Sequence, residues 1–385
     1  MLRSTTLSCT VVALVMAALA GSPAAAAPRS AYVTSFSSNV LSQFTIMRDG
    51  TLSPKSPPTV ATGTGPGIVA LRPGGRSAYV ANILDNTISQ FVIRRDGVLA
   101  PQRTATVATG VAPFSVVISR DGQSAYVASF AESTIWQYSI GRDGELSPKM
   151  PATVTTGAQP RAIALSPDGR DAYVTSQSTN TVSQFTIAAD GTLSPKDPPS
   201  VATGVAPRAV VISADGRNAY ISDSGGDSLS EYSIAPDGRL SPKTPATIPA
   251  GDEPVVIALS GDGRSAYVTD YSGAALTQYR VAHDGTLSLR TPANVATGAE
   301  PVVIALTDDD KSAFVTNFAA DRVSQYRIAA DGTLEPNSPP AVAMPPGPFM
   351  IALSHETCRP RSGYSFGFGR RPCDPGSRDA ANAFP

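Results

Sequence analysis

Cysteine, histidine and tryptophan are scarce in this sequence of 385 residues, which contains three, two and one of them. With so few of these side chains, the sequence carries no nucleophile motif and no metal-ligand spacing of the kind that thiol enzymes or zinc sites require. Acidic and basic residues nearly balance, with 31 Asp plus Glu against 30 Lys plus Arg. That balance gives no electrostatic reason to expect nucleic acid or an anionic membrane as a partner. We therefore predict no metal, no cofactor and no nucleic-acid partner.

Long hydrophobic runs are also missing, except for one near the N-terminus. A basic start at Arg3 is followed by an apolar stretch over residues 7–20 and then by Ala24-Ala25-Ala26. This order is typical of a secretory signal peptide, and the run is too short and wrongly flanked for a stable membrane span. Residues 1–26 are thus predicted to be a cleaved signal peptide. The mature protein is expected to be secreted or to lie at the cell-envelope exterior, with no membrane span.

Two cysteines, Cys358 and Cys373, remain after that cleavage, and both lie in a C-terminal tail rich in Gly, Pro, Arg and Ser. Disulfides persist outside the cytoplasm, so the simplest interpretation is one bridge between them. Two exposed thiols are the alternative. The tail, residues 358–385, is predicted to be irregular and to lie outside the folded domain of residues 27–357.

The chain does contain a phrase of 47 residues that is repeated seven times without an insertion. Its marker is a short segment similar to Ser-Ala-Tyr-Val. The aromatic residue of that segment recurs at Tyr32, Tyr79, Tyr126, Tyr173, Tyr220, Tyr267 and Phe314. A fixed period of this length indicates a repeat architecture, in which each copy buries its apolar face only against its neighbours.

Each copy is predicted to be a four-stranded antiparallel blade rather than a set of helices. Asp-Gly pairs, the strongest short-range signal of a β-hairpin, recur at residues 49–50, 96–97, 143–144, 190–191, 237–238, 284–285 and 331–332. These turns and the 34 prolines exclude long helices. Runs such as 162–165 are apolar on both faces and suit an innermost strand, whereas the proline-containing segment 193–196 suits an outer edge strand.

Seven such blades close a ring, so the predicted fold class is all-β: a seven-bladed β-propeller with four antiparallel strands per blade. The chain enters in the middle of a blade at Ser30 and ends with a spare strand of the innermost type at residues 348–353. That strand supplies what the first blade lacks. The N- and C-terminal strands are therefore predicted to share one blade, and the propeller is expected to be a monomer.

The segments 79–82 (Tyr-Val-Ala-Asn) and 314–317 (Phe-Val-Thr-Asn) resemble the signature of the YVTN family of seven-bladed propellers. The wider phrase over residues 159–170, with its Asp-Gly-Thr-Leu hairpins, resembles lactonase-type propellers related to 6-phosphogluconolactonase and carboxymuconate-cyclising enzymes. The resemblance runs from about residue 30 to residue 354. WD-repeat propellers are excluded by the single tryptophan and by the missing Gly-His and Trp-Asp pairs.

This resemblance implies hydrolysis or rearrangement of a lactone, with a general base, a water molecule and arginines that stabilise the developing oxyanion. Arg161 and Arg208 match the arginine of the Pro-Arg-His phrase common in that family. Ala162 and Ala209 stand where the phrase has histidine.

Positions at which one copy departs from the others are the candidates for function. Next to the loop proline, two successive blades carry Arg161 and Arg208, and the following two carry Glu253 and Glu300. These four residues are the candidate catalytic and ligand-binding groups, because paired arginines suit a carboxylate or phosphate and a glutamate suits a general base. The alternative interpretation is a solvated rim held by ion pairs.

Aromatic residues on the same face are predicted to complete a ligand pocket: Phe130, Tyr271 and Trp136. Trp136 replaces a Ser or Thr found in the six other copies, and the alternative is that it fills a gap between blades. The acidic loop Asp223–Asp227 offers oxygens to calcium, but without a defined ligand count it does not amount to a metal site.

A glutamine recurs at one strand position and is expected to bond to backbone or to the neighbouring blade. The series is Gln43, Gln90, Gln137, Gln184, Gln278 and Gln325. Glu231 interrupts it and is a further candidate for a site.

Because the histidine of the family phrase is missing, we predict a secreted binding or interaction protein that uses a funnel on this face. Its partner is an unknown small molecule, protein or peptide. The alternative function is a lactonase-like hydrolase that acts on a lactone ring.

Overall fold

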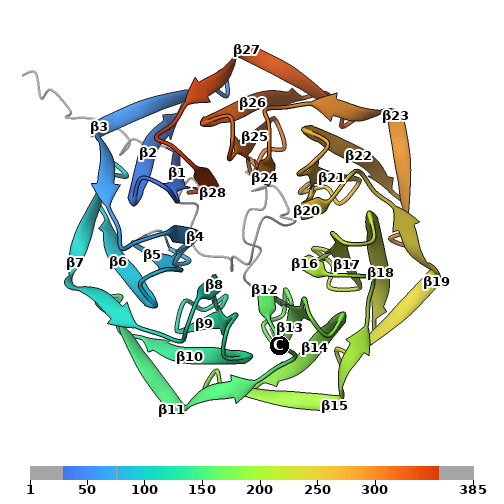
Figure 1. The fold of residues 1–385 in the computed structure, drawn as a ribbon, viewed down its shortest axis with the longest axis horizontal. Helices are drawn as coiled ribbons and strands as arrows, with labels where there is room; N and C mark the ends of the chain where they lie inside the picture. Colours follow the sequence, from blue (N-terminus) through green and yellow to red (C-terminus); the bar gives the residue numbers. More distant parts are fainter. Residues whose placement is uncertain (1–28, 75, 355–385) are drawn as a thin grey trace, which may run out of the picture.

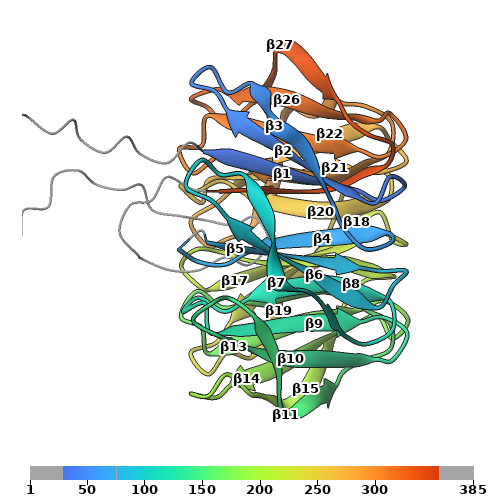
Figure 2. The same cartoon turned by 90° about the vertical axis from the view of Figure 1, so that its left-hand side faces the viewer.

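The computed structural model describes residues 29–74 and 76–354, and every regular element in those residues is a β-strand. The strands form seven sheets of four antiparallel strands each, arranged around a central axis (Figure 1). From the side, the sheets stand next to one another in a short closed ring (Figure 2). The predicted seven-bladed β-propeller is confirmed. The predicted signal peptide and the predicted Cys358–Cys373 bridge lie outside the described residues. Within the described residues, the structure contains no helix that could span a membrane.

The four strands of each blade follow one another from the axis outward. The innermost strands are β28 (Pro348–Leu353), β4 (Pro66–Leu71), β8 (Pro113–Ile118), β12 (Pro160–Leu165), β16 (Pro207–Ile212), β20 (Pro254–Leu259) and β24 (Pro301–Leu306). The second strands are β1 (Ser30–Ser35), β5 (Ser77–Asn82), β9 (Ser124–Ser129), β13 (Asp171–Ser176), β17 (Asn218–Asp223), β21 (Ser265–Asp270) and β25 (Ser312–Asn317). The third strands are β2 (Val40–Ile46), β6 (Thr87–Ile93), β10 (Thr134–Ile140), β14 (Thr181–Ile187), β18 (Ser228–Ile234), β22 (Ala275–Val281) and β26 (Arg322–Ile328). The outer strands are β3 (Leu52–Ala61), β7 (Leu99–Ala108), β11 (Leu146–Thr155), β15 (Leu193–Ala202), β19 (Leu240–Pro249), β23 (Leu287–Ala296) and β27 (Leu334–Ala343).

Ring closure follows the prediction from the two ends of the propeller. The C-terminal strand β28 pairs with the N-terminal strand β1 in antiparallel fashion, with Ala31 opposite Leu353 and Val33 opposite Ile351. The closing blade therefore has the order β28-β1-β2-β3, and its innermost strand comes from the far end of the chain.

The proline-containing strand is the outer edge of each blade, as predicted, but it is longer than the predicted segment 193–196. Each outer strand runs ten residues. In the closing blade Ser42 pairs with Thr59 and Phe44 with Pro54, so residues 55–58 form a bulge opposite Gln43. An edge strand tolerates such a bulge because its other side has no partner strand to lose.

The glutamine that faces this bulge joins neighbouring blades. Gln43 donates from Nε2 to the carbonyl of Pro57 at 3.2 Å, and its Oε1 accepts from the backbone amide of Leu99 in the next blade at 2.6 Å. The same two kinds of bond to backbone recur at Gln90, Gln137, Gln184, Gln278 and Gln325. Glu231 keeps the bond to the next blade, through the amide of Leu287 at 2.9 Å, and burial raises its pKa. Its contacts are those of the scaffold.

The marker tyrosines are packed in the core and also bond across the seams between blades. The hydroxyl of Tyr32 donates to the carbonyl of Gly97 in the next blade at 2.7 Å, and five more tyrosines repeat this bond at 2.6 to 2.7 Å. Phe314 takes this place at the seam with the closing blade. Gly50 lies against Ser312 there, as Gly97 lies against Ser30, so the seam has the same geometry without the hydroxyl.

Replacing Phe314 with tyrosine should therefore stabilise the ring. The added hydroxyl is expected to donate to the carbonyl of Gly50 and to raise the free energy of unfolding by about 1 kcal/mol, as measured by urea denaturation. Tyr267→Phe is the matched control and should lower the same quantity, because it leaves the carbonyl of Gly332 without its donor. A loss in Tyr267→Phe without a gain in Phe314→Tyr would contradict the equivalence of the last seam.

Two buried carboxylates end the second strands of adjacent blades. Asp223 and Asp270 are 0% and 1% exposed and occupy the position of Asn82 and Asn317 in other blades. Burial raises the pKa of each to about 6, although hydroxyl donors oppose the shift. Asp223 accepts from the hydroxyls of Thr203 and Ser230, whereas Oδ1 of Asp270 has no hydrogen-bond partner among the described residues. The fold therefore favours the protonated form of both groups.

Asp270→Asn is expected to make stability less dependent on pH. The folded-state pKa of Asp270 lies above the ordinary value of a carboxyl group. The protonated Asp270 therefore leaves the wild type at its full free energy of unfolding below about pH 4, and part of that free energy is lost as the pH rises through about 6. At pH 8 the free energy of unfolding of the variant should exceed that of the wild type by roughly 2–3 kcal/mol, and at pH 4 the two values should converge. Urea denaturation across that range measures the difference. Asp197→Asn, which removes an exposed carboxylate on β15, is the control. Parallel pH profiles for Asp270→Asn and the wild type would contradict the argument.

Candidate functional site

Each blade presents two side chains at the same end of the ring. One is the second residue of the innermost strand, and the other directly follows the second strand. Around the ring the pairs are Phe349 with Phe36, Gly67 with Ile83, Phe114 with Phe130, Arg161 with Gln177, Arg208 with Ser224, Val255 with Tyr271 and Val302 with Phe318. Charge at these positions is thus confined to two neighbouring blades.

The loop before each innermost strand is held by a backbone clamp. In every blade the residue before the loop proline has a left-handed conformation, with φ of 54° at Glu253 and 53° at Glu300. The carbonyl of Glu253 accepts from the amide of Tyr271 at 3.1 Å, and its own amide donates to Oδ1 of Asp227 in the preceding blade at 2.9 Å. The clamp uses only backbone atoms of Glu253, so the carboxylate takes no part in it.

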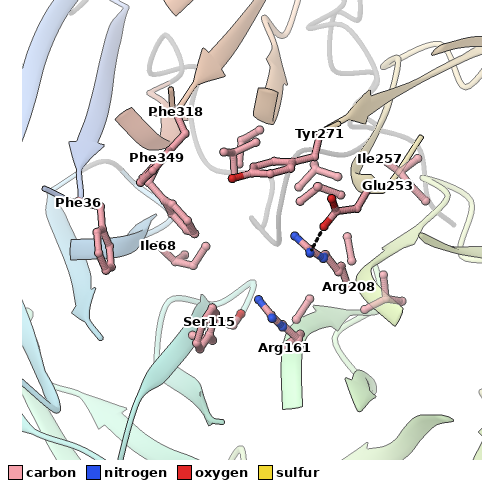
Figure 3. Close-up of a pocket in the computed structure, with 18 of the residues that line it drawn as sticks. Phe36, Ile68, Ser115, Arg161, Arg208, Glu253, Ile257, Tyr271, Phe318 and Phe349 are labelled. Carbon is pink, nitrogen blue, oxygen red and sulfur yellow. Dashed lines mark hydrogen bonds and ion pairs between the residues drawn. The ribbon is translucent and has the colours of Figure 1, made fainter. Parts of the chain in front are cut away.

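A cavity of about 530 Å³ lies at the centre of this end of the ring. Its volume falls within the usual range of small-molecule sites. Four phenylalanines line it: Phe36, Phe114, Phe318 and Phe349. Its polar lining consists of Ser115, Arg161, Arg208, Glu253 and Tyr271. Figure 3 shows Phe36, Phe318 and Phe349 on one side of the cavity and Arg161, Arg208 and Glu253 on the other.

Arg208 and Glu253 form an ion pair inside the cavity, through Nη2 and Oε1 (Figure 3). The other groups of both residues are also held, since Arg208 Nε donates to Ser224 at 3.0 Å and Glu253 Oε2 accepts from Ser272 at 2.8 Å. The side chains are 23% and 30% exposed, so the pair is accessible from the cavity mouth. This arrangement fixes the carboxylate while leaving it within reach of a water molecule.

Arg161 lies beside this pair but has no carboxylate of its own. Its Nε donates to Gln177 at 2.6 Å, and its guanidinium lies over the rings of Phe114 and Phe130, at 4.6 and 5.1 Å. Within residues 29–74 and 76–354, no carboxylate oxygen lies within the 4.0 Å of a salt bridge to it. Burial, followed by the charge of Arg208, lowers its pKa to about 10. An anion or a polarised carbonyl oxygen beside Arg161 would favour its charged form and so offset both effects.

Ser115 is the polar neighbour of Arg161 in the cavity lining. It lies on β8, next to β12 in the ring, and its side chain is 1% exposed. Its Oγ has no hydrogen-bond partner among the described residues. The other blades carry Ile, Ala, Ala, Val, Val and Met at this position. Nine other buried side-chain atoms of the described residues share this lack of a partner, and Oγ of Ser115 is closed off from solvent, so a ligand in the cavity reaches this hydroxyl only after the side chain turns toward it.

Glu300 is one step removed from the cavity. Its Oε2 accepts from the hydroxyl of Tyr271 at 2.7 Å. Burial, this hydrogen bond and the charges of Glu300 and Glu253 raise the pKa of Tyr271 to about 12. Tyr271 is thus held as a neutral hydroxyl that donates to Glu300, while its ring lies below Arg208 at 5.9 Å.

The structure brings four of the seven candidate residues to the cavity: Arg161, Arg208, Glu253 and Tyr271. Phe130 lies behind the lining, in contact with Arg161 and Phe114, and Glu300 is connected to it through Tyr271. Trp136 is not part of the lining. Its Nε1 donates to Glu132 at 3.1 Å, and its ring stacks on Tyr138 with centroids 6.4 Å apart.

Sequence reasoning missed three contributors, Ser115, Gln177 and Ser224. Gln177 and Ser224 belong to the series that follows the second strand, in which only the aromatic members stood out. The sequence did contain a signal for Gln177 and Ser224, because each of them lies 16 residues after the arginine that it contacts. Ser115 was hidden within an apolar run.

The acidic loop Asp223–Asp227 has structural contacts. Asp223 is bonded to two hydroxyls, and Asp227 accepts the amide of Glu253, as Asn39, Asn86 and Asn180 accept the equivalent amides in other blades. In the part of the chain that the structure describes, no group of three or more His, Cys, Asp or Glu side chains is placed to hold a metal ion.

Comparison with solved structures identifies the same architecture elsewhere. A candidate 6-phosphogluconolactonase from Bacteroides fragilis is 21% identical, with a TM-score of 0.75 over 85% of this chain and 98% of that chain. A periplasmic gluconolactonase from Pseudomonas aeruginosa is 20% identical, with a TM-score of 0.73 over 85% and 99%. Hydrazine synthase from Kuenenia stuttgartiensis is 19% identical, with a TM-score of 0.62 over 78% and 92%. At these identities the likeness concerns the fold alone.

Sequence comparison is more specific. No curated protein matches the chain. The family model described as Lactonase, 7-bladed beta-propeller, matches residues 38–205, 154–248 and 196–348. These overlapping matches span most of the propeller and include every polar residue of the cavity lining. The chain therefore belongs to the seven-bladed β-propeller family of lactonases.

Proposed function

We propose that this protein is a lactonase that opens a lactone ring by hydrolysis in the central cavity. The observation that carries the proposal is an arginine without a carboxylate partner, Arg161, next to the Arg208–Glu253 ion pair in a largely apolar cavity. Membership of the lactonase family supports this function over the binding or interaction protein that the sequence first suggested.

The chemistry follows from the positions of these groups. The carbonyl oxygen of the lactone accepts hydrogen bonds from the outer nitrogens of Arg161, joined by the hydroxyl of Ser115 once that side chain turns toward the cavity, and these bonds stabilise the negative charge that develops there. Glu253 takes a proton from a water molecule as the water oxygen bonds to the carbonyl carbon. The ring carbon–oxygen bond then breaks, and the proton passes to the departing alkoxide. The product is a hydroxy acid, and no atom or electron is left unaccounted for.

Glu253 is preferred to Glu300 as the general base because of their different contacts. Glu253 lines the cavity, whereas Glu300 is engaged by Tyr271 outside the lining. Ala162 and Ala209, which stand where the family phrase has histidine, also line the cavity and leave room beside the arginines. Glu253 is the base and also a member of the ion pair with Arg208. Its carboxylate interacts strongly with a polarised water molecule, because the apolar surroundings screen charge weakly.

The place of action is part of the proposal. The basic, apolar and small-residue segments at the N-terminus support export, and the Pseudomonas aeruginosa relative of similar fold is a periplasmic protein. We propose that this chain acts outside the cytoplasm as a monomer.

Glu253→Gln is expected to lower kcat for lactone hydrolysis by a factor of 10²–10⁴, because the amide cannot accept the proton. Binding of the hydroxy acid product should persist and become tighter, because Arg208 loses its carboxylate partner. Arg161→Gln should weaken product binding as well as turnover. A pH-stat assay on a panel of γ- and δ-lactones measures hydrolysis, and calorimetry measures product binding.

Glu335→Gln is the control, since Glu335 lies on the outer strand β27 and pairs with Arg327. Thermal unfolding of each variant separates a lost base from a lost fold. Full activity in a folded Glu253→Gln variant would refute the assignment of the base. Product binding by a wild-type protein that hydrolyses no lactone would instead favour a binding protein for organic anions.

A further inference from the structure

The lining of the cavity contains few hydrogen-bonding side chains. Of the nineteen lining residues, fourteen have apolar side chains, and the five polar ones are confined to one side. Most of their polar atoms already have partners, since Arg208 is paired with Glu253 and the Tyr271 hydroxyl donates to Glu300. Among the described residues of the lining, the side-chain groups that remain for a ligand are the outer guanidinium nitrogens of Arg161, Nη1 of Arg208 and the hydroxyl of Ser115.

The opposite side is an aromatic wall. Phe36, Phe318 and Phe349 pack against one another, with ring centroids 6.4, 6.1 and 6.4 Å apart. All three are only partly buried and line the cavity, together with Ile68 and Ile83 (Figure 3). The wall is therefore an apolar surface that faces the charged group across the cavity.

We propose that the ligand of this cavity is amphipathic: a lactone with an alkyl or aryl substituent, released as the corresponding hydroxy acid. The apolar body lies against the wall of Phe36, Phe318 and Phe349, and the carbonyl or carboxylate end lies at Arg161 and Ser115. The lactone part rests on the proposed function, whereas the amphipathic character of the ligand rests on the cavity alone.

The energetics separate this ligand class from sugar lactones. Each methylene group that moves from water onto the wall contributes about 0.8 kcal/mol, a factor of about four in affinity at 25 °C. A sugar hydroxyl placed on the same wall would lose its bonds to water and gain none, which disfavours binding. Arg161 and Ser115 can satisfy one oxygen-bearing end of a ligand, but not the several hydroxyls of a gluconolactone.

The test compares carboxylates and lactones of increasing chain length with the wild-type protein. Calorimetry with hexanoate, octanoate and decanoate, kept below their micelle-forming concentrations, should show the dissociation constant falling about two- to fourfold per methylene. Gluconate should bind at least tenfold more weakly than decanoate. In the hydrolysis assay, kcat/KM should rise from γ-hexalactone to γ-decalactone and exceed that for glucono-δ-lactone.

Variants assign the two ends of the ligand. Phe349→Ala should flatten the dependence on chain length, because it removes part of the wall. Arg161→Gln should weaken all three carboxylates by a similar factor and keep the slope. Met150→Ala and Arg103→Gln, which change side chains that are exposed on outer strands, are the matched controls.

Chain-length-dependent carboxylate binding without hydrolysis of any lactone would retain the amphipathic ligand and refute the lactonase. Hydrolysis of glucono-δ-lactone in preference to γ-decalactone would retain the lactonase and refute the amphipathic ligand. Affinity that does not change from hexanoate to decanoate in the wild type would overturn the inference directly, whatever the variants do.

Discussion

Buried hydrogen bonds between neighbouring blades are the constraint on which the rest of this structure depends. Apolar packing holds two sheets together but is non-directional, so by itself it does not fix how one blade is rotated against the next. Here the side chain of Gln43 accepts a backbone amide of the next blade, and the hydroxyl of Tyr32 donates to a backbone carbonyl of that blade. Two bonds at separate points fix the rotation. Because such bonds recur around the ring, they hold the seven loops in fixed positions around one cavity.

The chemistry of the cavity comes from a few departures from the repeated pattern. Arg161 and Arg208 occupy positions that are apolar in the other blades, and each is held by a polar residue of its own blade. Glu253 arrives from the next blade and pairs with Arg208. Neighbouring blades therefore contribute the cations, the anion and the unpartnered hydroxyl of Ser115 to one side of the ring. The remaining blades keep the apolar wall, which gives the cavity its two-sided character.

The sequence predicted the fold almost completely, because Asp-Gly turns, strand periodicity and proline placement report local backbone conformation that the ring then repeats. It also predicted that Arg161, Arg208 and Glu253 share one face, since they occupy related positions of successive blades. It could not predict which side chains reach the cavity. Trp136 turns to Glu132 instead, and Ser115 looked like one member of an apolar run. The ten-residue outer strands were also missed, because the bulge opposite each glutamine depends on pairing between strands.

The backbone clamp before each innermost strand has a consequence for how such proteins diversify. The clamp is made by the carbonyl and amide of a residue with positive φ, and in this chain that residue is Gly, Ala, Gln or Glu in different blades. Its side chain is therefore free of any duty in folding. At the five positions that already carry a side chain, a single substitution can introduce charge, bulk or an amide at the cavity mouth without changing the backbone clamp. At Gly65 and Gly347 a new side chain would first have to displace Leu84 or Ser37. New specificities can thus accumulate one blade at a time on an unchanged ring.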